Sequence, residues 1–404
     1  MTWLERLGRR RSSPAADDSP RRLLVDVSTI AQHDAGTGIQ RVVRGIWQHL
    51  YKADLGDVAL VPVAATARRG YGIGAFDPVS GSFSLPDPGA PLLKARAGDM
   101  FLGLDLAAHR LARHERQLAR WRRAGASINL VVYDLLPLQR PDWFPDSTGR
   151  NFRKWMKVLM RRADRAICIS GQVSRDLAIM LEQMSAPRRH SIERHVMPLS
   201  GAMEQSGPTM GLDSRGRDAL DRMEGEAGVL MVGTIEPRKG HDCLIAAMEY
   251  LWASEADAPP LVIVGRPGWR TEPLQAQMRE LETREPRFLW LDNASDELLA
   301  ELYGRAALVA VPSRGEGFGL PIVEALRHGR KILARDIPVF RELAQPGLSY
   351  FDDETPPALA ARLQEVLQKP DPAPVTGAGW DVSAEALLRA LGIKIDPPAV
   401  SRSS

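Results

Sequence analysis

Residues 308–324 read LVAVPSRGEGFGLPIVE, and this stretch decides the fold class. The apolar run 308–311 has the length of a buried strand, and a helix is expected after it, with Pro321 in its first turn and Gly329 at its end. The loop between them holds three glycines, which let a ligand approach the backbone while unpaired N–H groups at the helix start face it. Strand, glycine loop and helix together predict a ligand-binding turn of an α/β domain.

The same pattern recurs along the chain. A strand at 23–27, a polar loop at 28–38 and a helix at 39–50 open the sequence, and the helix repeats apolar residues on one face. Further short apolar runs predict buried strands at 58–61, 128–133, 165–169, 229–232, 261–264, 288–291 and 331–334. Such alternation favours two Rossmann-like domains with parallel sheets, whose ligands bind beyond the carboxyl ends of the strands, in a cleft between the domains.

Composition shifts give the expected boundaries. We predict a flexible basic tail at 1–21, an N-terminal Rossmann-like domain at 22–205 and a linker at 206–227, where apolar periodicity is lost. A C-terminal Rossmann-like domain at 228–375, a closing helix at 376–392 capped by Asp381, and a tail at 393–404 complete the division.

Composition also excludes several classes of protein. The 404 residues are 44% hydrophobic and 25% charged, which is ordinary for a globular protein, and the net charge of +3 is too small to indicate nucleic-acid binding by itself. Two cysteines, Cys168 and Cys243, cannot form a disulfide framework or a thiolate zinc site. Neither a membrane-spanning run nor a signal peptide is recognisable, so we expect a cytoplasmic protein.

A second glycine-flanked loop carries adjacent cations. The strand at 229–232 is followed by GTIEPRKGHD at 233–242, in which Arg238 and Lys239 suit a diphosphate group at a helix start. A solvated basic turn explains this segment equally well when it is considered alone. In the loop after 311, Glu316 and Glu324 are carboxylates that can accept hydrogen bonds from vicinal hydroxyls, although Glu324 alone would be read as a first-turn helix acid.

Taken together, these segments resemble the family 4 retaining glycosyltransferases of the GT-B fold. Glu316 and Glu324 have the spacing of the family's two signature glutamates, which are separated by seven residues. Residues 233–240 resemble the family's diphosphate loop. Residues 264–269 and the stretches Ser295-Asp296 and Leu302-Tyr303 also look like the family pattern. The resemblance covers about 23–391 and is closest to bacterial mannosyl- and rhamnosyltransferases of surface polysaccharide synthesis.

The resemblance implies a site and its ligands. Arg238 and Lys239 would hold the diphosphate together with Thr234, Glu324 would bind the ribose, and Glu316 would hold the transferred sugar. The remaining donor-binding positions are implied to be Gly317, Phe318, Gly319, Leu320, Arg266 and Gly38, with the base near Arg266 and 290–294. No cofactor is expected beyond the nucleotide-sugar donor, GDP-mannose, and no metal, because no Asp-x-Asp motif follows a strand.

The N-terminal half is expected to bind the acceptor. By the resemblance, the loop at Gly36–Gly38 faces the reaction centre, and either Arg41 or Arg44 points into the cleft. Tyr133 stands where the family usually has histidine; it can still donate a hydrogen bond to a sugar hydroxyl but does not titrate near neutrality. Asp134 is expected to orient the acceptor hydroxyl, the alternative being a helix cap. No side chain is nominated as a nucleophile, and front-face attack is the preferred retaining mechanism.

Two basic stretches, 107–124 and 150–165, carry most of the charge asymmetry. Their cations are interleaved with Trp121, Phe152, Trp155, Leu159 and Met160. This pattern favours peripheral contact with an anionic membrane at the cytoplasmic face of the inner membrane, and a lipid-linked glycan acceptor, over two solvated helix faces or nucleic acid. Rival functions are rhamnosyl or UDP-sugar transfer on the same fold, an isomerase or phosphorylase, and a non-catalytic glycan-binding subunit.

Overall fold

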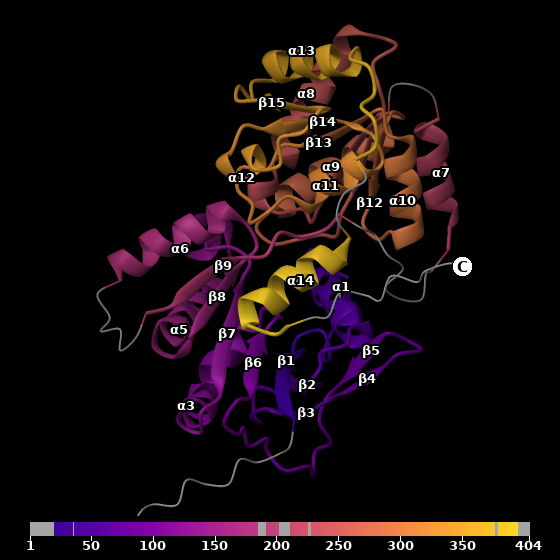
Figure 1. The fold of residues 1–404 in the computed structure, drawn as a ribbon. Helices are drawn as coiled ribbons and strands as arrows, with labels where there is room; N and C mark the ends of the chain where they lie inside the picture. The colour runs from indigo at the N-terminus through magenta and orange to yellow at the C-terminus, as the bar shows by residue number, and fades with distance from the viewer. Residues whose placement is uncertain are drawn as a thin grey trace, which may run out of the picture.

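The computed structural model describes residues 20–34, 36–184, 191–201, 211–224, 228–375 and 379–394. Two parallel sheets organise this part of the chain into an N-terminal lobe (residues 20–201) and a C-terminal lobe (211–375) (Figure 1). The tails predicted at both ends of the chain lie almost entirely outside the described residues.

The N-terminal lobe contains a seven-stranded sheet in the order β3-β2-β1-β6-β7-β8-β9, parallel except for the β2–β3 pair. Its strands are β1 (Arg21–Asp26), β2 (Val58–Ala64), β3 (Gly72–Ile73), β6 (Met100–Gly103), β7 (Ser127–Val132), β8 (Arg165–Cys168) and β9 (Glu193–Val196), and β4 (Ala75–Asp77) with β5 (Ser82–Ser84) forms a separate hairpin. The helices are α1 (Gly38–Lys52), α2 (Ala108–Leu111), α3 (Glu115–Arg123), α4 (Leu136–Gln139), α5 (Asp146–Arg162) and α6 (Gly171–Gln183), with short 3-10 turns at Ala112–His114 and Pro141–Trp143.

The C-terminal lobe contains a six-stranded, all-parallel sheet in the order β12-β11-β10-β13-β14-β15. Its strands are β10 (Val229–Val232), β11 (Leu261–Val264), β12 (Phe288–Leu291), β13 (Leu308–Val311), β14 (Lys331–Arg335) and β15 (Leu348–Phe351). Its helices are α7 (Ser214–Arg222), α8 (His241–Ser254), α9 (Glu272–Arg284), α10 (Asp296–Arg305), α11 (Leu320–Arg327), α12 (Pro338–Arg341) and α13 (Pro356–Leu367), with a 3-10 turn at Pro237–Lys239.

Both faces of the C-terminal sheet are buried. Val229 and Met231 of β10 pack in one hydrophobic cluster with α8, whereas Leu230 packs in the other with α10 and α11. This two-sided burial explains why its strands read as continuous apolar runs in the sequence rather than as alternating ones.

The range predicted as a linker contains a helix. Asp213 caps α7 by accepting a hydrogen bond from the Gly216 N–H at 2.6 Å, and Ala219 and Leu220 are buried against the C-terminal lobe. One short apolar face was enough to form this helix, and the loss of longer periodicity concealed it. The prediction of an irregular segment was therefore wrong at 214–222.

The C-terminal helix α14 (Trp380–Leu391) returns to the N-terminal lobe, where it lies beside α1 (Figure 1). Trp380 packs directly over Gly45, because a Cβ built on that glycine would meet the indole ring at 2.4 Å. The Ser383 hydroxyl donates to the Pro198 carbonyl at 2.7 Å. The predicted closing helix is confirmed, but its cap is not: Gly379 precedes the helix, and Asp381 lies in its first turn.

Because Trp380 is buried, Trp380→Ala is expected to lower the free energy of unfolding by about 3–5 kcal/mol. Urea denaturation of the whole chain measures this. Val382→Ala on the exposed side of the same helix is the matched control and should change stability by less than about 0.5 kcal/mol. Equal effects of the two substitutions would show that α14 does not fasten to the N-terminal lobe through Trp380.

Candidate active site

The carboxyl ends of β10 and β13 bring the predicted cations and carboxylate together. The Glu316 carboxylate accepts from Arg238 Nη1 at 2.7 Å on Oε2 and from Lys239 Nζ at 2.5 Å on Oε1. Ser313 Oγ donates to Oε1 at 2.9 Å, and Arg238 also pairs with Glu236 at 2.9 Å. The two loops that the sequence singled out therefore form one charged cluster.

This cluster is largely shielded from solvent. Burial by itself would raise the pKa of Glu316, whose side chain is 9% exposed, but Arg238 and Lys239 outweigh burial and hold its pKa at about 2. Burial opposes a higher pKa for Arg238, yet Glu316, Glu236 and Asp134 raise it. Glu316 and Arg238 are thus both ionised at neutral pH. Arg238 and Lys239 face two carboxylates. They can neutralise the negative charge of an incoming diphosphate if Glu316 turns away toward another partner.

The backbone of the loop at 233–240 packs closely against the neighbouring loop that begins at Pro312. Gly240, in the left-handed region at φ 75°, has the Pro312 carbonyl so close that a Cβ would meet it at 2.4 Å. Thr234 is half-buried at the opposite end of this loop. Beneath the loop, burial and then Lys239 lower the pKa of His241 to about 3, and its Nε2 lies 3.3 Å from the Gly233 carbonyl oxygen. A neutral histidine therefore supports the cation-bearing loop from inside.

The glycine loop of the C-terminal lobe presses against the N-terminal lobe. A Cβ on Gly317 would lie 1.9 Å from the Tyr133 carbonyl oxygen, and the Ser170 hydroxyl at the start of α6 donates to the Gly317 carbonyl at 2.8 Å. Gly319 adopts φ 114° just before α11, where a Cβ would meet the Phe340 ring. Phe318 itself is buried in the N-terminal core, so only its backbone is available to a ligand.

Tyr133 and Asp134 follow β7 and differ from expectation in one respect. The Tyr133 hydroxyl is buried and donates to the Leu104 carbonyl at 2.7 Å, so it does not replace the family histidine as a donor to a sugar. Asp134 Oδ1 accepts from the Leu136 N–H, at the first residue of α4, at 3.1 Å; this resembles the helix-cap alternative, although Leu135 occupies the cap position itself. Its carboxylate also borders the charged cluster: burial raises the pKa of Asp134, and Arg238 opposes that rise. The hydrogen bond to Leu136 and a role beside the cluster are compatible.

Glu324 lies at the lobe interface. It is placed on α11 and 4% exposed, and its Oε2 accepts from the Tyr303 hydroxyl at 2.7 Å. Its Oε1 accepts from Arg41 Nη1 of α1 at 3.1 Å, while Arg44 pairs with Asp34 in its own lobe. Of the two arginines, Arg41 therefore reaches the cleft. Tyr303 belongs to the stretch Leu302-Tyr303, which resembles the family pattern, but the contact of its hydroxyl with Glu324 could not be predicted from the sequence.

The remaining predicted positions surround this interface. Gly38 precedes Arg41 and contacts Leu320, because a Cβ there would meet the leucine side chain at 3.3 Å. Arg266 is exposed beyond β11. Trp290 is 4% exposed and donates its indole N–H to the Gly265 carbonyl at 2.8 Å, so it supports that loop and offers no face for stacking a base.

An aromatic clasp, defined as Trp143, Phe144 and Trp269, joins the lobes beside Glu316 and was missed from the sequence. Trp269 Nε1 donates to the Trp143 carbonyl at 2.9 Å, and the Phe144 and Trp269 ring centroids lie 6.1 Å apart. The Trp143 ring covers Gly315, where a Cβ would meet it at 2.7 Å. Trp269 is the last residue of the stretch 264–269, which resembles the family pattern. Its partner on the other lobe, Trp143, lies in no stretch that the sequence marked as functional.

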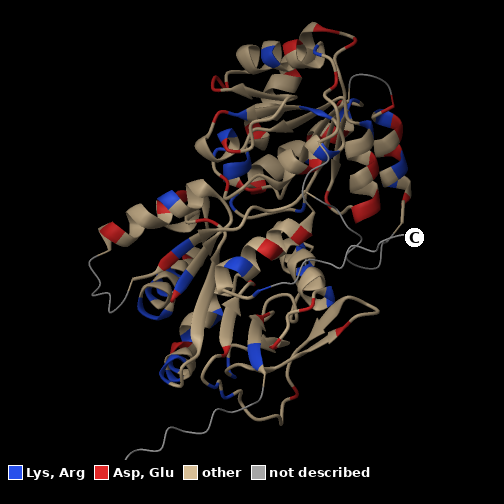
Figure 2. Ribbon diagram, in the orientation of Figure 1, with Lys and Arg blue, Asp and Glu red and all other residues tan. Residues whose placement is uncertain are grey.

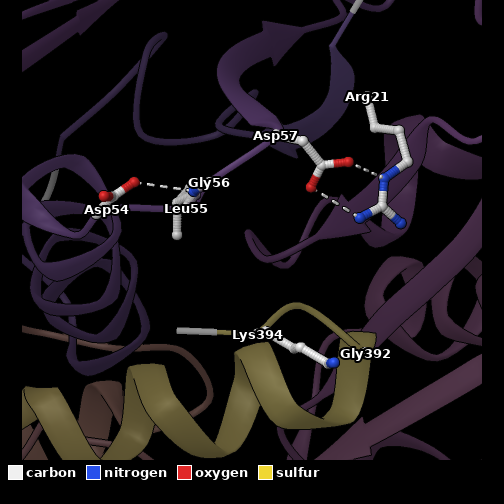
Figure 3. Close-up of a pocket in the computed structure, with 7 residues that line it drawn as sticks. All are labelled: Arg21, Asp54, Leu55, Gly56, Asp57, Gly392 and Lys394. Atoms are coloured by element: carbon white, nitrogen blue, oxygen red, sulfur yellow. Dashed lines mark hydrogen bonds and ion pairs between the residues drawn. The ribbon is translucent and has the colours of Figure 1, made fainter. Parts of the chain in front are cut away.

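Within the described ranges, no group of three or more His, Cys, Asp or Glu side chains is arranged to hold a metal ion. None of the described helices combines the length and hydropathy of a membrane span. A hollow of about 370 Å³ lies at the opposite, amino-terminal edge of the first sheet, between the Arg21–Asp57 ion pair and Lys394 (Figure 3). That hollow is separate from the loops described above.

The fold and its charged loops define a two-lobed GT-B protein. Two solved structures share the fold: Anabaena HepE in complex with UDP and glucose (TM-score 0.55, 15% identity, 93% of this chain and 95% of that one) and sucrose-phosphate synthase from Thermosynechococcus elongatus (0.59, 15%, 92% and 94%). The predicted fold class is thereby confirmed.

Sequence comparison points to the same kind of protein. Residues 215–375, which make up most of the C-terminal lobe, match the model of the glycosyl transferases group 1. The serotype-specific mannosyltransferase WbdA of Escherichia coli is 36% identical over 388 residues, or 92% of this chain and 45% of that protein. The chain thus spans less than half the length of this relative.

Proposed function

We propose that the chain is a retaining mannosyltransferase that moves mannose from GDP-mannose to a lipid-linked or growing polysaccharide of the O-antigen type. The observation that carries this proposal is Glu316 held between Arg238 and Lys239 at the carboxyl ends of two neighbouring strands. The similarity to WbdA supports mannose as the sugar.

In this proposal the diphosphate of the donor binds Arg238 and Lys239. Glu316 then gives up its contacts with these two cations and accepts hydrogen bonds from hydroxyls of the transferred mannose. The cations stabilise the charge that develops on the leaving diphosphate, in the place of a metal. A donor phosphate oxygen accepts the proton of the acceptor hydroxyl, which attacks on the face that the diphosphate leaves. Asp134 borders the cluster from the N-terminal lobe and orients that hydroxyl.

A panel of GDP-, UDP-, dTDP- and ADP-sugars, followed by product analysis by NMR, tests the donor and the anomeric outcome. We expect turnover with GDP-mannose and an α-linked product. Turnover with dTDP-rhamnose or a UDP-sugar alone would favour the alternative donors on the same fold. Binding of glycan without hydrolysis or transfer from any donor would favour a non-catalytic glycan-binding subunit. A trapped glycosyl–enzyme adduct would contradict front-face attack.

The basic face of α3 and α5 supports a peripheral contact with anionic lipid at the cytoplasmic face of the inner membrane. Figure 2 shows Lys and Arg gathered on both helices. The exposed cations are Arg113, Arg116, Arg120, Arg123, Arg150, Arg153, Lys154, Lys157 and Arg161. The interleaved aromatics, in contrast, are buried against the sheet, so the expectation that they share the basic face was wrong. The contact we propose is therefore electrostatic, without inserted side chains.

Vesicle flotation tests this contact. The chain is expected to float with vesicles containing anionic lipid in 50 mM salt, to lose most of that binding in about 0.5 M salt, and not to bind neutral vesicles. A variant with Arg116, Arg120, Arg153 and Lys157 changed to Gln should stop floating yet transfer normally to a water-soluble acceptor. Equal binding to neutral and anionic vesicles would contradict the electrostatic contact.

A further inference from the structure

Arg41 links the two lobes at the carboxylate proposed to bind the donor ribose. It projects from α1 of the N-terminal lobe and donates to Glu324 Oε1 at 3.1 Å through Nη1 and to Asp296 Oδ1 at 3.0 Å through Nη2. Both acceptors belong to the C-terminal lobe, and both are more than 250 residues away along the chain. One guanidinium therefore spans the cleft with two separate charge-assisted hydrogen bonds.

The contacts leave Glu324 able to bind a diol. A carboxylate offers about four lone-pair sites on two oxygens, and here Arg41 takes one site on Oε1 while Tyr303 takes one on Oε2. One acceptor site thus remains on each oxygen. Vicinal ribose hydroxyls need just such a pair of acceptors in a fixed orientation. Arg41 and Tyr303 fix that orientation because they hold the carboxylate from two different elements.

The charge on Glu324 depends on few groups. On α1, Arg41 faces it; on α10, Tyr303 contacts it, and Asp296 shares Arg41. On its own helix, His328 stacks on Tyr303 at 5.7 Å, and burial lowers the pKa of that histidine. Among the described residues that contact the carboxylate, Arg41 is the single cation.

We propose that Arg41 is a positioning residue that completes the nucleotide site from the opposite lobe: it holds the Glu324 carboxylate in a fixed orientation, and so sets the preference for ribose over deoxyribose. This inference rests on the proposed function, because it takes Glu324 to bind the donor ribose. It adds that nucleotide recognition in the C-terminal lobe requires α1 of the N-terminal lobe to be in contact. Donor binding and lobe apposition are thereby coupled.

Calorimetric titration of the full chain with GDP and with 2′-deoxy-GDP tests the proposal. The variants are Arg41→Gln and Arg41→Lys, with Arg44→Gln as the matched control: it removes the same charge from the same helix, but Arg44 pairs with Asp34 and not with Glu324. Thermal denaturation of each variant shows whether it is folded. Arg41→Lys retains the charge and so remains informative where the Gln variant is unstable.

We expect Arg41→Gln to weaken GDP binding about tenfold and to reduce the preference for GDP over 2′-deoxy-GDP to less than about twofold. Arg41→Lys should weaken GDP binding less than Arg41→Gln does, because the ammonium group keeps a charged hydrogen bond to Glu324, and Arg44→Gln should resemble wild type.

The outcomes separate the inference from the function on which it rests. If wild type binds GDP and prefers it over 2′-deoxy-GDP, and Arg41→Gln keeps the same preference, Arg41 is only a bridge between lobes and the inference is wrong. If a folded Arg44→Gln loses as much as Arg41→Gln, the effect is one of general charge, and the inference also fails. If wild type binds neither GDP nor UDP, the proposed function itself is overturned, and the inference with it.

Discussion

Glu316→Gln is expected to reduce transfer from the nucleotide sugar by about 10²- to 10³-fold, while the binding of GDP becomes no weaker. The reason lies in the ion pairs: Glu316 competes with the diphosphate for Arg238 and Lys239, and the amide no longer does. The hydroxyls of the transferred sugar, however, lose a charged hydrogen-bond acceptor, the Glu316 carboxylate. Steady-state kinetics and calorimetry with GDP measure the two effects separately.

Lys239→Met provides the contrast, because it removes a cation from the same cluster and should weaken GDP binding and transfer together. Glu316→Gln leaves two buried cations without their shared partner, so the free protein is expected to lose about 3–5 kcal/mol of stability, which GDP should partly restore. If Glu316→Gln keeps full turnover, or weakens GDP binding as much as Lys239→Met, the diphosphate and sugar are not bound as proposed.

The sequence predicted those elements that carry local signals. Each strand followed by a glycine loop was found, because an apolar run, a change of composition and a helical repeat occur within about twenty residues of one another. The strands β3, β4, β5, β6, β9 and β15 were not predicted. They have two to four residues and lack the unbroken aliphatic run of four-residue strands that were found, such as LVIV at 261–264. The short helix α7 was concealed by the same lack of length.

The candidate site could be predicted only within each loop. Arg238, Lys239 and Glu316 were singled out by their positions after two strands that prove to be neighbours in the sheet. The contacts across the lobes were not readable: Arg41 with Glu324, Tyr133 with Gly317, and Trp143 with Trp269 are each separated by more than 100 residues. A single sequence does not specify which distant surfaces meet, so partners of this kind come from the structure.

In the basic helices, cations and aromatic residues are neighbours in the sequence but lie on different faces of the folded protein. The cations and aromatics between 107 and 165 do alternate along the chain, but a helix with a period of 3.6 residues separates them onto opposite faces. Phe152 and Trp155 pack into the core, whereas Arg153 and Lys154 face solvent. Adjacent positions in the sequence therefore gave no information about whether the two kinds of side chain share a surface.

Gly317→Ala is expected to reduce transfer by about 100-fold with the C-terminal lobe still folded. A methyl group at this position would lie 1.9 Å from the Tyr133 carbonyl oxygen and 3.3 Å from Asp134 Cβ, so the glycine loop and the end of β7 have to move apart. Neither is a flexible side chain that can turn away. The movement displaces Glu316, the adjacent residue, from Asp134 on the other lobe.

Gly304→Ala is the matched control, because its Cβ would have only His328 Nδ1 within reach, at 4.0 Å, and the residue lies in α10 of the same lobe. It should leave transfer unchanged and stability equal or slightly higher. Gly304→Ala should bind GDP as the unchanged chain does, whereas Gly317→Ala should bind it more weakly, because moving the lobes apart also draws Arg41 away from Glu324. The two variants should differ most in turnover with an acceptor. Full turnover by Gly317→Ala would mean that the reaction does not require the contact between the glycine loop and β7. The lobes would then have to carry out transfer in a more open arrangement than this one, and Asp134 would be left with its hydrogen bond to the first residue of α4.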